Sequence, residues 1–147
     1  MRHAVMSQAD LQRVTDRFIA SMNGHDAAAL AALYAADCAV ESPFFSALQG
    51  RAMVEESFRQ WFAIFPDCLV AIESMIVDPP RVAFAGMVTA THEGELFGLP
   101  PTHKKVEFRI VLLTEIEDGL ISRERRVYDF TGLLVQLGVL RAKPAKA

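Results

Sequence analysis

The sequence predicts an α+β domain in which N-terminal helices pack on a curved, mainly antiparallel sheet. The chain up to residue 65 carries apolar positions at helical spacing. The rest is dominated by long segments rich in β-branched and aromatic residues, and turn signals separate these segments. A run of helices followed by a run of strands is typical of the α+β class.

The first helix is expected to begin after Ser7 and to end before Asn23. Ser7 and Asp10 have the spacing of an N-terminal capping pattern, and Asn23-Gly24 is a stop signal. One face of this helix is apolar, with Leu11, Val14, Phe18, Ile19 and Met22. This stripe is expected to pack on the sheet.

Two further helices and a short strand follow. Asp26 caps a second helix at residues 27–34 (AAALAALY), which has almost no polar face. A short strand is expected at residues 38–42, followed by a loop. The third helix is expected at residues 51–65, and the proline that follows it ends it.

The C-terminal half is expected to form long strands. These lie at residues 67–77, 80–92, 104–117 and 120–130, before a short helix at 131–138. Asp118-Gly119 is a strong hairpin signal between the last two strands. In the strand at 104–117 an apolar row, Val106, Phe108, Ile110 and Leu112, alternates with a mixed row, Glu107, Arg109, Val111, Leu113 and Glu115. Because residues 108–116 (FRIVLLTEI) have too few polar residues for a water-exposed face, we expect a homodimer that covers this sheet face.

Composition excludes several classes of partner. The chain has 147 residues, enough for a single domain, and a formal net charge of -3. No general attraction to nucleic acid or to an anionic membrane is therefore expected. No segment reaches the ~20 apolar residues of a membrane-spanning helix. Two cysteines without metal-type spacing indicate a cytoplasmic protein, and residues 1–6 and 142–147 are expected to be flexible.

The last strand is unusually rich in charge. Alternation places Ser122, Glu124, Arg126 and Tyr128 on one face and Arg123, Arg125 and Val127 on the other. If the hairpin register pairs the first set with the apolar row, Glu124, Arg126 and Tyr128 point inward, whereas a slip of one residue reverses this. The charges then either neutralise each other at the sheet edge or form the floor of an apolar cleft. In such a cleft Arg126 would neutralise an oxyanion, and Glu124 would act as a base.

Two segments carry a resemblance to a known family. HEGELFGLPPTHKKVEF contains residues 98–102 (GLPPT) before a strand, and DGLISRERRVYDFTGLLVQLG has Asp129 three residues before GLLVQLG. Over nearly its whole length the chain resembles the SnoaL-like polyketide cyclases of the nuclear-transport-factor-2-like superfamily. The resemblance implies a single domain with a cone-shaped α+β barrel, usually dimeric, around an apolar pocket. It also implies aldol ring closure without a metal or organic cofactor.

Two positions depart from the family pattern. The cyclases carry an acid–base aspartate six residues before the glycine of the GLL segment, where this chain has Arg126, and a histidine where it has Leu112. An arginine does not act as an acid or base near neutral pH. Asp129 and His92 match an aspartate and a histidine of the pattern, although Asp129 also fits the position of a helix cap. With Glu124 they are the groups left for proton transfer.

The remaining residues define the expected ligand site. The predicted substrate-binding residues are Tyr128, Trp61, Phe44, Phe108 and Leu112. The four histidines lack metal-type spacing, so neither a metal nor another cofactor is expected. The leading hypothesis is a polyketide-cyclase-like enzyme of lyase or isomerase type, which cyclises, isomerises or hydrates a largely apolar, oxygenated small molecule. The alternatives are a non-catalytic small-molecule-binding protein and a dimeric interaction module of the same fold.

Overall fold

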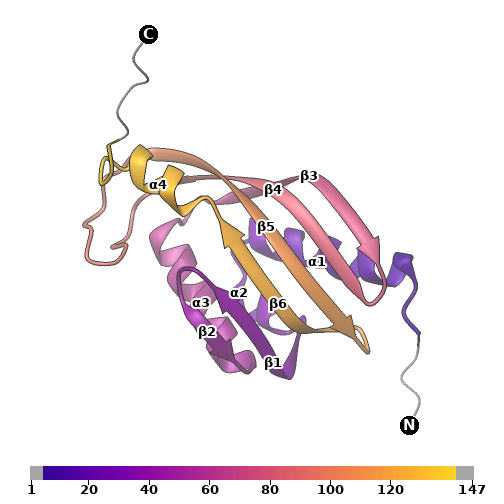
Figure 1. Cartoon of the computed structure of the whole chain (residues 1–147). Coiled ribbons are helices and arrows are strands. Elements are labelled where there is room, and N and C mark those ends of the chain that lie inside the picture. The colour runs from indigo at the N-terminus through magenta and orange to yellow at the C-terminus, as the bar shows by residue number, and fades with distance from the viewer. Residues whose placement is uncertain (1–4, 142–147) are drawn as a thin grey trace.

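The computed structural model describes residues 5–141 and confirms the α+β class, with four helices and one six-stranded sheet in that part of the chain (Figure 1). The helices are α1 (Gln8–Asn23), α2 (Ala27–Ala31), α3 (Arg51–Ile64) and α4 (Phe130–Gln136). The strands are β1 (Tyr34–Ser42), β2 (Ser46–Gln49), β3 (Leu69–Asp78), β4 (Arg81–Thr91), β5 (Lys105–Glu117) and β6 (Leu120–Tyr128). Most of the two predicted flexible ends, residues 1–4 and 142–147, lies outside the described residues. None of the helices within residues 5–141 is long and apolar enough to cross a membrane.

The first helix begins and ends where the sequence predicts. The Ser7 hydroxyl accepts a hydrogen bond from the Asp10 N–H at 3.1 Å, and the Asp10 carboxylate accepts one from the Ser7 N–H at 2.9 Å. Phe18 of α1 then packs against Phe58 of α3 and Phe84 of β4, with ring centres 6.2 and 6.1 Å away. These contacts hold α1 and α3 on the same face of the sheet (Figure 1).

The second helix is shorter than predicted, and the first strand is longer. α2 ends at Ala31, and β1 already begins at Tyr34. The reason is tertiary, because Tyr34 pairs with Ile121 of β6, and the Leu33 carbonyl accepts a hydrogen bond from the Ile121 N–H at 2.8 Å. Pairing with a strand far along the chain overrides the helical preference of AAALAALY.

The strand order is β2-β1-β6-β5-β4-β3, and every neighbouring pair is antiparallel except β1 and β6. Neither β2 nor this parallel pair was predicted from the sequence. Of the two hairpin registers that the sequence left open, the structure has the one that pairs like with like, since Leu112 lies opposite Arg126 and Thr114 opposite Glu124. Glu124 and Arg126 are therefore buried on the inner face with the apolar row of β5. The sheet stays open at β2 and β3, so it does not close into a barrel.

Two side-chain amides complete hydrogen bonds where a strand has no neighbouring strand. Asn23 at the end of α1 donates to the Val70 carbonyl at 3.2 Å and accepts from the Val70 N–H at 2.8 Å, on the free edge of β3. Gln136 of α4 accepts from the Glu107 N–H of β5 at 2.8 Å and donates to its carbonyl at 2.7 Å. The two amides thereby satisfy backbone groups and anchor both helices to the sheet.

Candidate functional site

Three polar side chains form a buried cluster on the inner face of the sheet. Arg126 Nε donates to Glu124 Oε1 at 2.7 Å, and the two side chains are only 3% and 0% exposed. The Tyr34 hydroxyl lies 2.8 and 2.9 Å from the two Glu124 oxygens and accepts a longer hydrogen bond, 3.4 Å, from an Nη of Arg126. Tyr34 comes from β1 and the other two residues from β6, so the parallel strand pair assembles the cluster.

Burial controls the protonation of this cluster. It raises the pKa of Tyr34 well above its ordinary value, and the neighbouring Glu124 adds to the effect, so the hydroxyl keeps its proton and donates. Burial opposes the charge of Arg126, but the oxygens of Tyr34 and Glu124 outweigh burial and raise the pKa of Arg126 above its ordinary value. Arg126 is therefore a fixed cation. Its guanidinium carbon also lies 4.7 Å from the centre of the Phe58 ring, within cation–π range.

The carboxylate of Glu124 is already engaged by two side chains. Both of its oxygens face the Tyr34 hydroxyl, and one of them also accepts from Arg126. A general base must reach the proton that it removes, whereas these lone pairs point at the cluster itself. The arrangement therefore favours Glu124 as the residue that orients Arg126, and its role as a base stays a prediction.

A small apolar cavity lies beside the cluster, between α1, α3 and the inner face of the sheet. Its volume is about 20 Å³, which holds about one water molecule. The side chains with polar groups on its wall are Arg126, Tyr128 and Trp61, and no carboxylate or imidazole lines it. Within residues 5–141 the ring N–H of Trp61 has no nitrogen or oxygen acceptor, and the group that interacts with it is the Cys68 thiol. Such a wall suits a ligand that carries oxygen acceptors on an apolar frame.

The five predicted substrate-binding residues lie at or next to this cavity. Tyr128, Trp61 and Leu112 line it. The Phe44 ring centre lies 5.2 Å from that of Trp61 and 5.0 Å from that of Tyr128, so Phe44 packs against two residues of the wall. Phe108 contacts Trp61 at 6.0 Å. The structure thus brings these residues together, and ligand contact stays a prediction.

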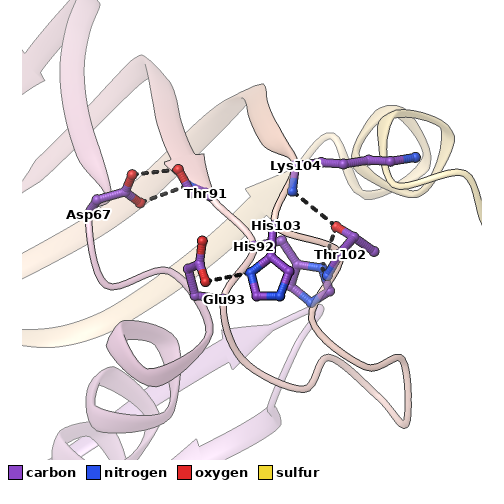
Figure 2. Close-up of polar contacts among 7 residues, drawn as sticks. All are labelled: Asp67, Thr91, His92, Glu93, Thr102, His103 and Lys104. Atoms are coloured by element: carbon purple, nitrogen blue, oxygen red, sulfur yellow. Dashed lines mark hydrogen bonds and ion pairs between the residues drawn. The ribbon is translucent and has the colours of Figure 1, made fainter.

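His92 lies apart from the cluster, fully buried just beyond the end of β4 (Figure 2). Its Nδ1 accepts hydrogen bonds from the Thr102 N–H at 3.2 Å and the Thr102 hydroxyl at 2.9 Å. Because a backbone N–H only donates, Nδ1 is unprotonated and Nε2 carries the proton of the neutral ring. Nε2 has no hydrogen-bond partner in the described part of the chain. His92 therefore fixes the end of the β4–β5 loop, and its role in proton transfer stays a prediction.

Asp129 occupies the capping position of α4, one of the two roles that the sequence allowed. It is exposed, and its Oδ1 accepts from the Gly132 N–H at 2.9 Å. Within residues 5–141 no hydrogen bond or ion pair given by the structure joins Asp129 to Glu124 or Arg126. Of the four predicted catalytic residues, the structure therefore brings together Glu124 and Arg126 and leaves Asp129 and His92 at other places.

Sequence reasoning missed Tyr34, which completes the cluster. Its position reads as the end of a helix, and 90 residues separate it from Glu124. Only the parallel pairing of β1 with β6 brings the two together. The sequence held one signal that such a partner exists, because a charged pair that faces inward among apolar residues requires a further polar partner.

The outer face of the sheet forms a second distinctive surface. A groove of about 610 Å³ crosses it from β2 to β3. The ion pairs Arg125–Glu41 and Arg109–Glu73, with N–O distances of 2.9 and 3.1 Å, lie on this face. Its two central strands expose the apolar side chains of Val111, Leu113 and Val127, which are 36%, 44% and 49% exposed. An apolar centre with charges of both signs around it is typical of protein–protein interfaces.

Within residues 5–141, no group of three or more His, Cys, Asp or Glu side chains is placed to hold a metal ion.

Comparisons with known proteins agree with this architecture. A family model described as SnoaL-like polyketide cyclase matches residues 10–137. AclR of Streptomyces galilaeus, described as a candidate hydroxylase, is 27% identical over 94% of this chain and 91% of that chain, with a TM-score of 0.84. IdmH of Streptomyces antibioticus, described as a candidate polyketide cyclase, is 23% identical over 87% of this chain and 98% of that chain, with a TM-score of 0.75. A Catenulispora acidiphila protein with a ketosteroid isomerase-like fold is 16% identical over 86% of this chain and 93% of that chain, with a TM-score of 0.74. No curated protein matches this sequence.

Proposed function

This chain belongs to the SnoaL-like polyketide cyclase family, and from that premise we propose that it is a cofactor-independent enzyme that stabilises an enolate on a largely apolar, oxygenated small molecule. The observation that carries the proposal is Arg126, a buried cation on the wall of an apolar cavity. A fixed cation in an apolar, water-poor site stabilises a developing oxyanion more strongly than it would in water. The names of relatives such as IdmH support the same class of chemistry.

The proposed reaction begins when a base removes a proton from the carbon next to a carbonyl group. Arg126 and Tyr128 then hold the oxygen of the resulting enolate. Burial raises the pKa of Tyr128, so its hydroxyl keeps its proton near neutral pH and donates to that oxygen. Attack of the enolate carbon on a second carbonyl closes a ring, and protonation at a different carbon isomerises the molecule. Among Glu124, His92 and Asp129, only Glu124 is hydrogen-bonded to a residue of the cavity wall, and it takes the proton in this proposal once its hydrogen bonds to Tyr34 and Arg126 open.

A second candidate function is a small-molecule-binding protein without catalysis. The engagement of Glu124 by Tyr34 and Arg126 favours this candidate, because it leaves no free base at the cavity wall. The two candidates differ in one measurable property. An enzyme of the proposed kind accelerates exchange of the protons next to a carbonyl group, whereas a binding protein does not.

The experiment follows hydrogen–deuterium exchange of 1-tetralone, a bicyclic aromatic ketone, in heavy water by proton NMR. We expect the protein to accelerate exchange next to the carbonyl and Tyr128→Phe to reduce that acceleration. Phe62→Leu is the control, since Phe62 packs on His25 and does not line the cavity. A shift of the Trp61 indole N–H signal without exchange would support the binding protein. Neither shift nor exchange would contradict both candidates and favour the interaction module.

The outer face of the sheet is proposed to pair with a second copy of the chain. A two-fold interface places each apolar residue against the partner's apolar centre and lets charges of both signs meet opposite charges. Val127→Arg on this face should convert a dimer into a monomer of 16.3 kDa in light scattering. Gln60→Arg, on the exposed side of α3, should leave the dimer intact. A monomeric wild-type protein at micromolar concentration would contradict the proposed dimer.

The proposed cellular setting is the cytoplasm. It is supported by two buried, free thiols, Cys38 and Cys68.

A further inference from the structure

The central cavity is far smaller than the ligand that the proposed function requires. Its volume is about 20 Å³, whereas sites for drug-sized ligands enclose about 300–1,000 Å³. Part of the wall must therefore move before such a ligand enters. The turn between β1 and β2 supplies one wall residue, Phe45, and the neighbouring Phe44 packs against two others, Trp61 and Tyr128.

Phe44 lies between the cavity wall and the protein surface. Its ring is 5% exposed and contacts Trp61 and Tyr128 on the wall, at 5.2 and 5.0 Å between ring centres. On its other side it stacks on Phe97, at 5.7 Å and an angle of 14°, and Phe97 is 65% exposed. Phe130 contacts both Phe44 and Phe97, at 5.2 and 5.9 Å. The rings of Phe44, Phe97 and Phe130 thus form an aromatic stack that continues from the cavity wall to the solvent.

The backbone that carries Phe44 lies at the edge of the sheet, where few strand pairings hold it. The residue lies in the turn between β1 and β2, and β2 is a four-residue edge strand that pairs only with β1. Its own N–H donates to the Ser42 hydroxyl at 3.2 Å. The turn, the β4–β5 loop with Phe97 and α4 lie at one end of the molecule (Figure 1). The turn can therefore swing outward without breaking any pairing of β1 with β6 or of the four strands beyond it.

We propose that Phe44 is an aromatic plug whose ring fills the space that the apolar frame of a ligand takes when it binds. This inference rests on the proposed function of the cavity. Trp61 and Tyr128 offer Phe44 the ring contacts that they would offer a flat ligand. Phe44 is thus an internal competitor of the ligand, and its removal increases affinity. A residue that simply formed part of the binding wall would have the opposite effect, because its removal takes away contact area.

The experiment measures binding of 8-anilinonaphthalene-1-sulfonate, which combines a flat aromatic frame with an anionic group that matches Arg126. Trp61 is the only tryptophan of the chain, so its indole N–H gives a single NMR signal that reports occupation of the cavity. Phe44→Ala should strengthen the apparent affinity by about tenfold or more, because a binding-competent state that is populated at about 0.1–10% weakens affinity by that fraction. Phe62→Ala, a matched substitution away from the mouth, should bind like the wild type.

The outcomes separate this inference from the proposed function. Equal or weaker binding by Phe44→Ala, with a Trp61 shift in both proteins, overturns the plug and leaves the cavity as a ligand site. No Trp61 shift in any variant overturns the proposed function of the cavity as well. If Phe44→Ala loses the dispersed NMR spectrum of a folded protein, Phe97→Ala provides the test instead. Phe97 is largely exposed, and its removal takes away the ring that stacks on the outer side of Phe44. Stronger binding by that variant supports the plug, and unchanged or weaker binding refutes it.

Discussion

Replacement of Arg126 by methionine tests whether the buried cluster exists in solution as described. The substitution keeps a long side chain but removes the cation, its 2.7 Å hydrogen bond to Glu124 and its contact with the Phe58 ring. Glu124, which is 0% exposed, is then left buried with Tyr34 as its remaining partner. Breaking a buried ion pair from one side costs about 3–5 kcal/mol. We therefore expect Arg126→Met to lower the free energy of unfolding by that amount.

A second substitution separates the charge from the packing. Glu124→Gln in the Arg126→Met background removes the unpaired negative charge while a side-chain oxygen remains to accept from Tyr34. The double variant should recover most of the loss and remain within about 1–2 kcal/mol of the wild type, which is the scale of one altered hydrogen bond. Glu124→Gln alone should lower the free energy of unfolding by several times the loss in the double variant, because it leaves Arg126 buried without its counter-ion.

Urea titration followed by Trp61 fluorescence supplies the measurement, since Trp61 is the only tryptophan and is buried next to the cluster. The three variants and the wild type form a double-mutant cycle with a coupling energy of several kcal/mol. A loss below about 1 kcal/mol for Arg126→Met, with no recovery in the double variant, would refute the reasoning. It would mean that Arg126 reaches water in solution and that the cavity is open.

Further predictions concern individual groups. Tyr34→Phe removes the donor to both Glu124 oxygens and should cost about 1–3 kcal/mol in the same titration; an unchanged midpoint would contradict the donor role. Burial raises the pKa of Tyr34 above its ordinary value of 10.0, so the unfolded chain loses that proton first, and the contribution of Tyr34 to stability should be constant below about pH 9 and fall as the pH rises beyond about 10; urea midpoints of the wild type and Tyr34→Phe across this range check the sign. Burial raises the pKa of the Cys68 thiol to about 11, so a disulfide reagent should modify it only after unfolding; rapid labelling of the native protein would disagree. Asn23→Ala frees the Val70 backbone pair on the β3 edge and should cost about 1–2 kcal/mol by urea titration, whereas a neutral effect would show that water replaces the amide.

Elements with local signals could be predicted from the sequence. The capping box at Ser7 and the proline after α3 set helix boundaries, and Asp118-Gly119 set the β5–β6 hairpin. β2 escaped prediction because four residues carry too little periodicity to be distinguished from a loop. The predicted end of α2 was wrong because the pairing of β1 with β6 sets where the helix stops. No local pattern in the sequence records that pairing.

The site shows the same division. Alternation along β6 predicts that Glu124 and Arg126 share one face, but only the hairpin register seen in the structure shows that this face is the inner one. Tyr34 required knowledge of a parallel strand pair, so only the structure reveals it. The cavity volume depends on how the rings of Phe44, Trp61 and their neighbours pack in three dimensions, and spacing along the chain does not encode such packing.

The parallel pairing of β1 with β6 also governs the order in which the chain acquires structure during synthesis. β1 and β2 are complete once Gln49 has been added, but the strand that must lie beside β1 ends at Tyr128. At about 5–20 residues per second this interval lasts roughly 4–16 s, and a hairpin alone is marginally stable in water. The nascent chain therefore carries β1 as an unfinished edge until nearly the whole domain has been made. Closure of the Tyr34–Glu124 contact is then a late step, and a chain interrupted before β6 cannot complete it.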